Sequence, residues 1–207
     1  MGRLFKTKNN MDLNHLTEIT YTGDTDISQH LLTLYSLTIS LKAKNILELG
    51  VRNGNSTLAF LLGTTVTEGQ LVSVDITENN LLRETYKQFK NWNYIISDSL
   101  TFLQTHKPVT PYDIIFIDDW HDGEHVSKEL EYIEKYITTS SLILLHDAMC
   151  YNTQPKYHLY LDKDGEFANG GPYGALKNLD KDVWEFCTIP VNNGLTILRK
   201  KDSVAIF

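Results

Sequence analysis

A run of four apolar residues, Ile114-Ile115-Phe116-Ile117, is the feature that most restricts how this chain can fold. Asp113 precedes the run and Asp118 follows it. A strand that is buried on both faces reads as a continuous apolar run, and such strands lie in the middle of parallel sheets covered by helices on both sides. We therefore predict that residues 113–118 form a central strand of an α/β sheet.

Similar segments recur along the chain, and all but the last are followed by apolar residues at helical spacing. The expected strands cover residues 45–50, 69–75, 93–96, 113–118 and 141–145, and the expected helices begin near residues 56, 81, 100 and 126. This alternation predicts a doubly wound, mostly parallel sheet, with ligands at the carboxyl ends of its strands. Residues 184–189 and 195–199 flank an Asn193-Gly194 turn signal, which predicts an antiparallel hairpin at the C-terminal end of the sheet.

At 207 residues the chain has the length of a single domain. We expect residues 1–25 to form an irregular arm, because they are polar and rich in Thr and Asn. The domain would cover residues 26–207 and open with a helix capped by Asp26 or Ser28. Glycines and a proline interrupt the region of about residues 149–181, which predicts a lid or substrate loop.

Composition and charge exclude several classes of partner. The formal net charge of -7 argues against a nonspecific nucleic-acid binder, which needs a surplus of Lys and Arg, and favours a small-molecule substrate. No stretch approaches the roughly 18 apolar residues of a membrane span, and the N-terminus lacks the apolar region of a signal peptide. Cys150 and Cys187 form no C-x-x-C pair. We expect a cytoplasmic protein without membrane partners, and a homodimer remains open.

The first strand-turn-helix unit contains the sequence E-L-G-V-R-N-G-N-S at residues 48–56. Gly50 and Gly54 allow a sharp turn and a close approach of the backbone to a ligand, and a helix starting near Ser56 offers free N–H groups. The spacing is neither that of a dinucleotide-binding G-x-G-x-x-G nor that of a phosphate-binding P-loop. By itself this turn is equally compatible with an ordinary βα connection.

Acidic residues follow the next two strands. Asp75 ends the second strand, where an acid of this topology typically receives ribose hydroxyls. Asp98 follows the third strand and either accepts a hydrogen bond from an adenine amino group or caps the next helix, as Ser99 also could. Together the two acids point to a nucleoside.

The densest group of chemically competent residues covers 118–125, with His146-Asp147 at the end of the neighbouring strand. Asp118, His146 and Asp147 predict either a site for Mg²⁺ or another divalent cation, or a metal-free hydrogen-bond network. His121 is the best candidate for a general base, because an imidazole with a reference pKa near 6.5 is mostly neutral at pH 7, whereas a lysine would need its pKa lowered by roughly 3 units.

These segments together resemble the class I S-adenosylmethionine-dependent methyltransferases, and within them the small O-methyltransferases that include catechol O-methyltransferase and antibiotic- and sugar-tailoring enzymes. The resemblance runs from about residue 26 to the C-terminus. It rests on residues 46–50 with Gly54 and Ser56, residues 72–75, Asp98-Ser99, residues 116–118 and His146-Asp147.

The resemblance implies a Rossmann-like methyltransferase fold and S-adenosylmethionine as cofactor. The implied cofactor-binding residues are Glu48, Gly50, Gly54, Asn55 and Ser56 around the methionine part, Asp75 at the ribose, Asp98 and Ser99 at the adenine, and Asp118 at the reacting centre. His121 stands where the catechol enzymes place a catalytic lysine, and His146-Asp147 stands where they carry an Asp-Asn pair. The expected activity is methyl transfer to a hydroxyl of a small molecule, a sugar, a phenol or a natural product, with His121 and Asp118 catalytic.

Two other functions compete with this one. His121, Glu124 and His125 match the inverted zinc-protease pattern H-x-x-E-H, which would make the protein a zinc hydrolase. Gly123 inside the motif argues against the continuous helix that such a site needs. The other alternative is a nonenzymatic member of the fold that keeps the cofactor pocket. A Rossmann dehydrogenase is disfavoured because its glycine pattern is missing.

Overall fold

The computed structural model describes residues 11–149 and 168–202, and its centre is a seven-stranded sheet with strand order β3-β2-β1-β4-β5-β7-β6. The first five strands are parallel neighbours, and β7 pairs antiparallel with both β5 and β6. The strands are β1 (Asn45–Leu49), β2 (Gln70–Asp75), β3 (Trp92–Ile96), β4 (Ile114–Ile117), β5 (Leu142–Leu145), β6 (Trp184–Ile189) and β7 (Leu195–Lys200). The predicted doubly wound sheet and its C-terminal hairpin are confirmed.

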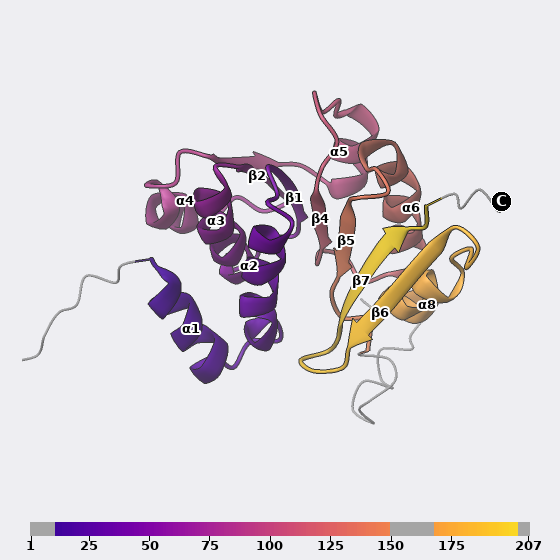
Figure 1. Ribbon diagram of the computed structural model, residues 1–207, viewed down its shortest axis with the longest axis horizontal. Coiled ribbons are helices and arrows are strands. Elements are labelled where there is room, and N and C mark those ends of the chain that lie inside the picture. The colour runs from indigo at the N-terminus through magenta and orange to yellow at the C-terminus, as the bar shows by residue number, and fades with distance from the viewer. Residues whose placement is uncertain (1–10, 150–167, 203–207) are drawn as a thin grey trace, which may run out of the picture.

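Helices cover both faces of the sheet (Figure 1). One group consists of α1 (Leu13–Thr22), the short 3-10 turn η1 (Ser28–His30), α2 (Leu31–Ser40), α3 (Asn55–Thr67) and α4 (Asn80–Tyr86). The other group consists of α5 (Ser99–Thr105), α6 (Gly123–Ile133) with the turn η2 (Glu134–Tyr136), and α8 (Gly171–Lys177), which follows the turn η4 (Ala168–Gly170).

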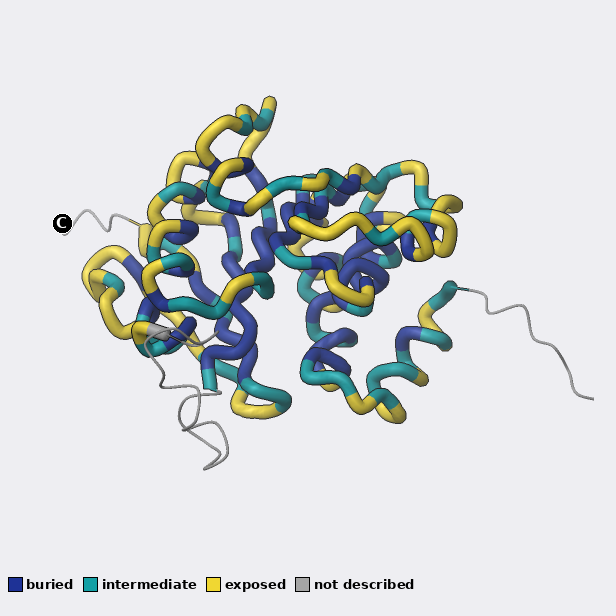
Figure 2. Tube along the Cα trace, turned by 180° about the vertical axis from the view of Figure 1, so that it is seen from behind, coloured by how far each residue is buried: buried dark blue, intermediate teal, exposed yellow. Residues whose placement is uncertain are grey.

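The alternation of side chains along each strand divides the core into two apolar clusters. Ile46 of β1 and Phe116 of β4 pack in the cluster under α2 and α3, whereas Leu47 and Ile115 pack in the cluster under α5 and α6. All four residues of β4 are buried, as expected for the centre of a sheet covered on both sides. Figure 2 shows this buried centre between the more exposed outer turns.

The N-terminal region differs from its prediction. Residues 13–22 form the helix α1 rather than an irregular arm. The Asp12 carboxylate accepts a hydrogen bond from the backbone N–H of His15 and caps this helix, and Leu16 is fully buried against the core. One apolar face, with Leu16 and Ile19 three residues apart, is enough to dock an otherwise polar helix.

The predicted lid at about residues 149–181 lies largely outside the described residues, which resume at 168. Within its last part, the helix α8 packs against α6. In the described part of the chain, no helix is both long enough and apolar enough to cross a membrane.

Candidate active site

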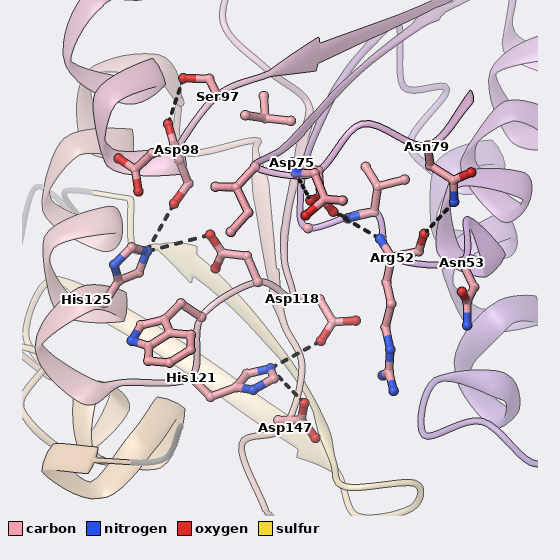
Figure 3. A pocket seen from close by; sticks show the side chains of 18 of the residues that line it. Arg52, Asn53, Asp75, Asn79, Ser97, Asp98, Asp118, His121, His125 and Asp147 are labelled. Carbon is pink, nitrogen blue, oxygen red and sulfur yellow. Dashed lines mark hydrogen bonds and ion pairs between the residues drawn. The ribbon is translucent and has the colours of Figure 1, made fainter. Parts of the chain in front are cut away.

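A pocket of about 950 Å³ opens at the carboxyl ends of the parallel strands. Its walls come from the loops that follow β1 to β5, which is the edge where an α/β sheet binds its ligands (Figure 3). The residues that line it are 50–53, 74–79, 97–99 and 118–121, with Asp26, His125, Asp147 and Asn193.

The turn after β1 forms one wall of the pocket. Gly50 has a φ of +88°, and a Cβ atom at this position would lie 2.1 Å from the carbonyl oxygen of Asp118. Only glycine therefore lets the loop after β1 lie directly against the loop after β4.

Asp75, at the end of β2, holds this turn in place. Its Oδ2 accepts hydrogen bonds from the backbone N–H groups of Val51 at 2.9 Å and Arg52 at 3.1 Å, and its Oδ1 accepts one from Thr77 at 2.8 Å. Asp75 lines the pocket as the sequence predicted, but it also orders the glycine turn, a role that the sequence analysis missed.

Glu48 does not line the pocket. It is fully buried on the face of β1 that α3 covers, and its carboxylate accepts hydrogen bonds from the hydroxyls of Ser56 (2.7 Å), Thr57 (2.9 Å) and Ser73 (2.6 Å). Burial raises the pKa of Glu48 to about 7, although these three donors oppose the shift. Glu48 thus links β1, β2 and the first turn of α3 from inside the core.

The other predicted residues of the first helix also lie outside the residues that line the pocket. Gly54 has a φ of +79° and precedes α3, and its carbonyl oxygen accepts a hydrogen bond from the buried Tyr86 hydroxyl at 3.0 Å. Asn55 reaches Thr25 at 3.4 Å, and Ser56 is turned to Glu48. From this turn, the residues that line the pocket are Gly50, which was predicted, and Val51, Arg52 and Asn53, which were not.

Asp98 lies across the pocket from Arg52 and Asn79 (Figure 3), and Ser99 also lines the pocket. Asp98 caps α5, with its Oδ1 accepting from the N–H of Thr101 at 2.8 Å. Ser99 is nearly buried, and its hydroxyl lies 3.0 Å from Nε2 of His125. The helix-cap interpretation of Asp98 is therefore confirmed, and its position on the pocket wall leaves room for a ligand contact as well.

His146 is buried at the floor of the site, and both of its ring nitrogens are engaged. Nε2 lies 3.1 Å from the carbonyl oxygen of Asp26 and 3.0 Å from that of Asn192, and Nδ1 lies 3.0 Å from Oδ1 of Asp118. Burial alone would lower the pKa of His146, but Asp118 and Asp147 raise it well above 6.5. With hydrogen-bond acceptors at both nitrogens, His146 is an imidazolium that donates on each side.

His121 lies beside the same two acids (Figure 3). Its Nε2 is 2.9 Å from Oδ2 of Asp147 and 3.6 Å from Oδ1 of Asp118, and 12% of its side chain is exposed. Burial alone would raise the pKa of Asp147, but His121 and His146 hold it well below 3.8. Asp147 also has a φ of +59°, in the left-handed region that non-glycine residues adopt uncommonly.

The predicted cation site at Asp118, His146 and Asp147 fits these contacts poorly. A metal ligand must present a lone pair, whereas both nitrogens of His146 donate hydrogen bonds. The ligand atoms that do lie within 4.8 Å of one another belong to Asp118, His121 and Asp147. A cation at this centre would therefore use His121 in place of His146.

The three residues of the inverted zinc-protease pattern do not meet. His121 precedes α6 and faces Asp147, His125 faces Asp119 and Glu129, and Glu124 is exposed on the first turn of the helix. The pattern in the sequence is thus a coincidence of spacing, and the zinc-hydrolase alternative is not supported.

Comparison with known proteins agrees with this geometry. Residues 47–148 match a family model described as a methyltransferase domain. No curated protein sequence matches the chain.

Three solved structures with bound cofactor or product have similar folds. The Podospora anserina methyltransferase PaMTH1 with bound S-adenosylhomocysteine has 21% identity and a TM-score of 0.64, covering 84% of this chain and 77% of its own. A Bacillus cereus O-methyltransferase in complex with S-adenosylhomocysteine has 16% identity and a TM-score of 0.66, with coverages of 95% and 94%. The Streptomyces achromogenes O-methyltransferase TomG, involved in tomaymycin synthesis and bound to S-adenosylmethionine, has 14% identity and a TM-score of 0.64, with coverages of 84% and 81%. At these identities the likeness is one of fold.

Proposed function

We propose that this chain is a class I S-adenosylmethionine-dependent methyltransferase and that it transfers a methyl group to a hydroxyl of a small molecule. The observation that carries the proposal is the pairing of His121 with Asp147 at 2.9 Å on the wall of the pocket that also contains Asp75 and Asp98. One cavity thus holds an oriented imidazole and the acids expected around a nucleoside.

The cofactor would lie across the carboxyl ends of β1, β2 and β3. Gly50 lines the pocket, and its backbone would lie against the methionine part, since glycine carries no side chain there. Asp75 would accept the ribose hydroxyls, and a carboxylate that already takes three N–H donors still has acceptor capacity for a further hydrogen bond. Asp98 would accept from the adenine amino group with the oxygen that does not cap α5.

When bound, S-adenosylmethionine supplies an electrophilic methyl carbon, so the protein has to align a hydroxyl with it and remove the hydroxyl proton. His121 would take this proton. Asp147 pairs with its Nε2 at 2.9 Å and would hold the ring, as a buried carboxylate orients the histidine of a catalytic triad. Nδ1, the other ring nitrogen, would then accept the proton.

The His146 imidazolium gives the centre a fixed positive charge. It lies 3.0 Å from Asp118 and 3.3 Å from Asp147, so it offsets the repulsion between these two carboxylates. A divalent cation bound by His121 would take Nε2, the nitrogen beside Asp147. The ring proton would then stay on Nδ1, so His121 could not act as the base and as a ligand at the same time. We favour the base, because the centre already contains a cation.

Binding of the cofactor is tested by titration calorimetry with S-adenosylmethionine and with NAD. We expect binding of S-adenosylmethionine only, and Asp75→Asn should weaken it at least about tenfold, which corresponds to the loss of one charge-assisted hydrogen bond of about 1.5 kcal/mol. Asp113→Asn is the matched control. Asp113 also accepts two backbone N–H groups, from Lys44 and Asn45, but at the opposite edge of the sheet. Equal affinities of the two variants would contradict the assignment of Asp75.

The base is tested with His121→Gln, assayed by release of S-adenosylhomocysteine across a panel of sugar, phenol and small-acid acceptors. The variant should lose methyl transfer by roughly a hundredfold or more, the usual contribution of a general base, while its cofactor affinity stays within about twofold. His15→Gln, on α1, is the control that keeps the histidine change outside the pocket. Unchanged turnover of the His121 variant would exclude the base, and turnover that requires added Mg²⁺ would make His121 a metal ligand instead.

A further inference from the structure

A second cluster of ligand-type side chains lies next to the first and takes no part in the proposed methyl transfer. It consists of Asp119, His125 and Glu129, whose ligand atoms lie within 4.8 Å of one another. The two clusters use different side chains: His121 faces Asp147, whereas His125 faces Asp119 and Glu129. Asp119 follows β4, and His125 and Glu129 lie one turn apart on α6, so both histidine and glutamate face the same side of the helix.

Three oxygen atoms converge on one nitrogen in this cluster. Nε2 of His125 lies 3.0 Å from the Ser99 hydroxyl, 3.4 Å from Oε1 of Glu129 and 3.6 Å from Oδ2 of Asp119. A single N–H group at Nε2 can serve only one of these acceptors well. Ser99, Asp119 and Glu129 thus bring three oxygen atoms from three segments of the chain to the same nitrogen.

Glu129 is the most unusual member of the cluster. Its side chain is 0% exposed, it lies on the helix face that carries the buried Val126, Leu130 and Ile133, and neither of its carboxylate oxygens has a hydrogen-bond partner. Oδ1 of Asp119 likewise has no partner. A buried carboxyl group that lacks hydrogen bonds is costly, and a native fold retains such a group only with a compensating interaction.

We propose that Asp119, His125 and Glu129 bind a structural zinc ion. One imidazole nitrogen and two carboxylate oxygens are a donor set that Zn²⁺ accepts, with the Ser99 hydroxyl close enough to complete a four-coordinate site. The ion would tie the loop after β4 to α6 and to the first residue of α5. Because Ser99, Asp119 and His125 all line the pocket, the zinc would hold that wall in its binding shape.

The site is not that of a hydrolase. Glu129 is fully buried, and the exposed Glu124, which would have to act as the base, lies outside the cluster.

The test is a titration of chelator-treated protein with Zn²⁺, followed by calorimetry and by metal analysis after dialysis. Wild type should bind Zn²⁺ at this site, and Glu129→Gln should bind it roughly a hundredfold more weakly, because even indirect partners of a metal contribute 10–100-fold in affinity. Glu131→Gln is the matched control, a glutamate on the exposed side of the same helix, and should bind like wild type. Asp147→Asn, which alters the other cluster, should also retain the site.

Thermal unfolding of the same variants shows whether a loss of Zn²⁺ binding comes from a failure to fold. Glu129→Gln removes a buried ionisable group, so the metal-free variant should unfold at a temperature no lower than metal-free wild type. Added Zn²⁺ should raise the unfolding temperature of wild type and Glu131→Gln but not of Glu129→Gln or His125→Gln. The proposal is wrong if wild type binds no Zn²⁺, or if Zn²⁺ binds and stabilises the Glu129 and Glu131 variants equally.

Discussion

Replacement of Glu48 by glutamine should remove a pH dependence that this one carboxyl group imposes on stability. Glu48 is completely buried, and its pKa rises from 4.5 to about 7 on folding. The native state therefore holds the proton more tightly than the unfolded chain does. The resulting stabilisation is fully present below pH 4.5 and is lost as the pH rises through about 7.

The size of the effect follows from the shift. At about 1.4 kcal/mol per pH unit, a pKa that moves from 4.5 to about 7 corresponds to about 3 kcal/mol of unfolding free energy. Most of this, about 2.5 kcal/mol, should disappear between about pH 5 and about pH 8. The glutamine variant lacks the titrating group. The unfolding free energy of the variant minus that of wild type should therefore increase as the pH rises from about 5 to about 8.

Urea unfolding followed by tryptophan fluorescence at several pH values measures this difference. The titrating groups that both proteins share contribute equally to the two free energies, so their contributions cancel in the difference. Ser73→Ala provides a second reading, because the Ser73 hydroxyl donates to Glu48 at 2.6 Å and its loss should move the pH window upward. The reasoning would be refuted if the difference in unfolding free energy between wild type and Glu48→Gln stayed constant over this pH range.

Three further substitutions test other parts of the structure. Gly50→Ala should cost about 3 kcal/mol or more in a thermal or urea melt, because it combines a φ of +88° with a Cβ position 2.1 Å from a backbone oxygen; a loss below about 1 kcal/mol would contradict this. Tyr86→Phe removes the buried hydrogen bond to Gly54 and should cost about 1 kcal/mol without changing the acceptor range, as checked by the same melts and the acceptor panel. His146→Gln removes the buried cation between Asp118 and Asp147 and should cost about 3 kcal/mol at about pH 6, with a smaller loss as the pH rises above 6.5, because a histidine whose pKa is raised on folding stabilises the native state less as its unfolded form loses the proton; a loss independent of pH would argue against a charged His146.

Much of the fold was predictable from the sequence, because local patterns determine it. Apolar runs such as residues 114–117 and the Asn193-Gly194 turn specify strands and a hairpin directly, and the strand ends specify one edge of the sheet. Asp75, Asp98, Asp118 and His121 were located correctly on the pocket for this reason.

The directions of side chains were harder to predict. Glu48 is in the middle of β1, and the alternation of a strand puts it on the same face as Ile46, beneath α3, rather than at the strand end. That alternation, together with the hydroxyl residues Ser56 and Thr57 in the first turn of α3, was the sequence signal that could have predicted the direction of the Glu48 side chain. Hydrogen bonds between segments far apart in the chain leave no local signal, so the roles of Asn192 and Asp26 at His146 could not be foreseen.

The hairpin turn between β6 and β7 gives the chain a particular order of assembly. Val191 and Asn192 contact His30 and Thr25, at sequence separations of 161 and 167, and the carbonyl of Asn192 also accepts from His146. During synthesis, the central sheet has emerged before these residues exist, so His146 spends that interval without one of its acceptors. Nascent chains stalled before and after residue 193 should therefore differ in the protease protection of the segment around His30, although both contain the whole parallel sheet. The group of polar side chains around His146 is thus among the last parts of the molecule to form. Chaperones would bind a chain in which this polar group is not yet covered.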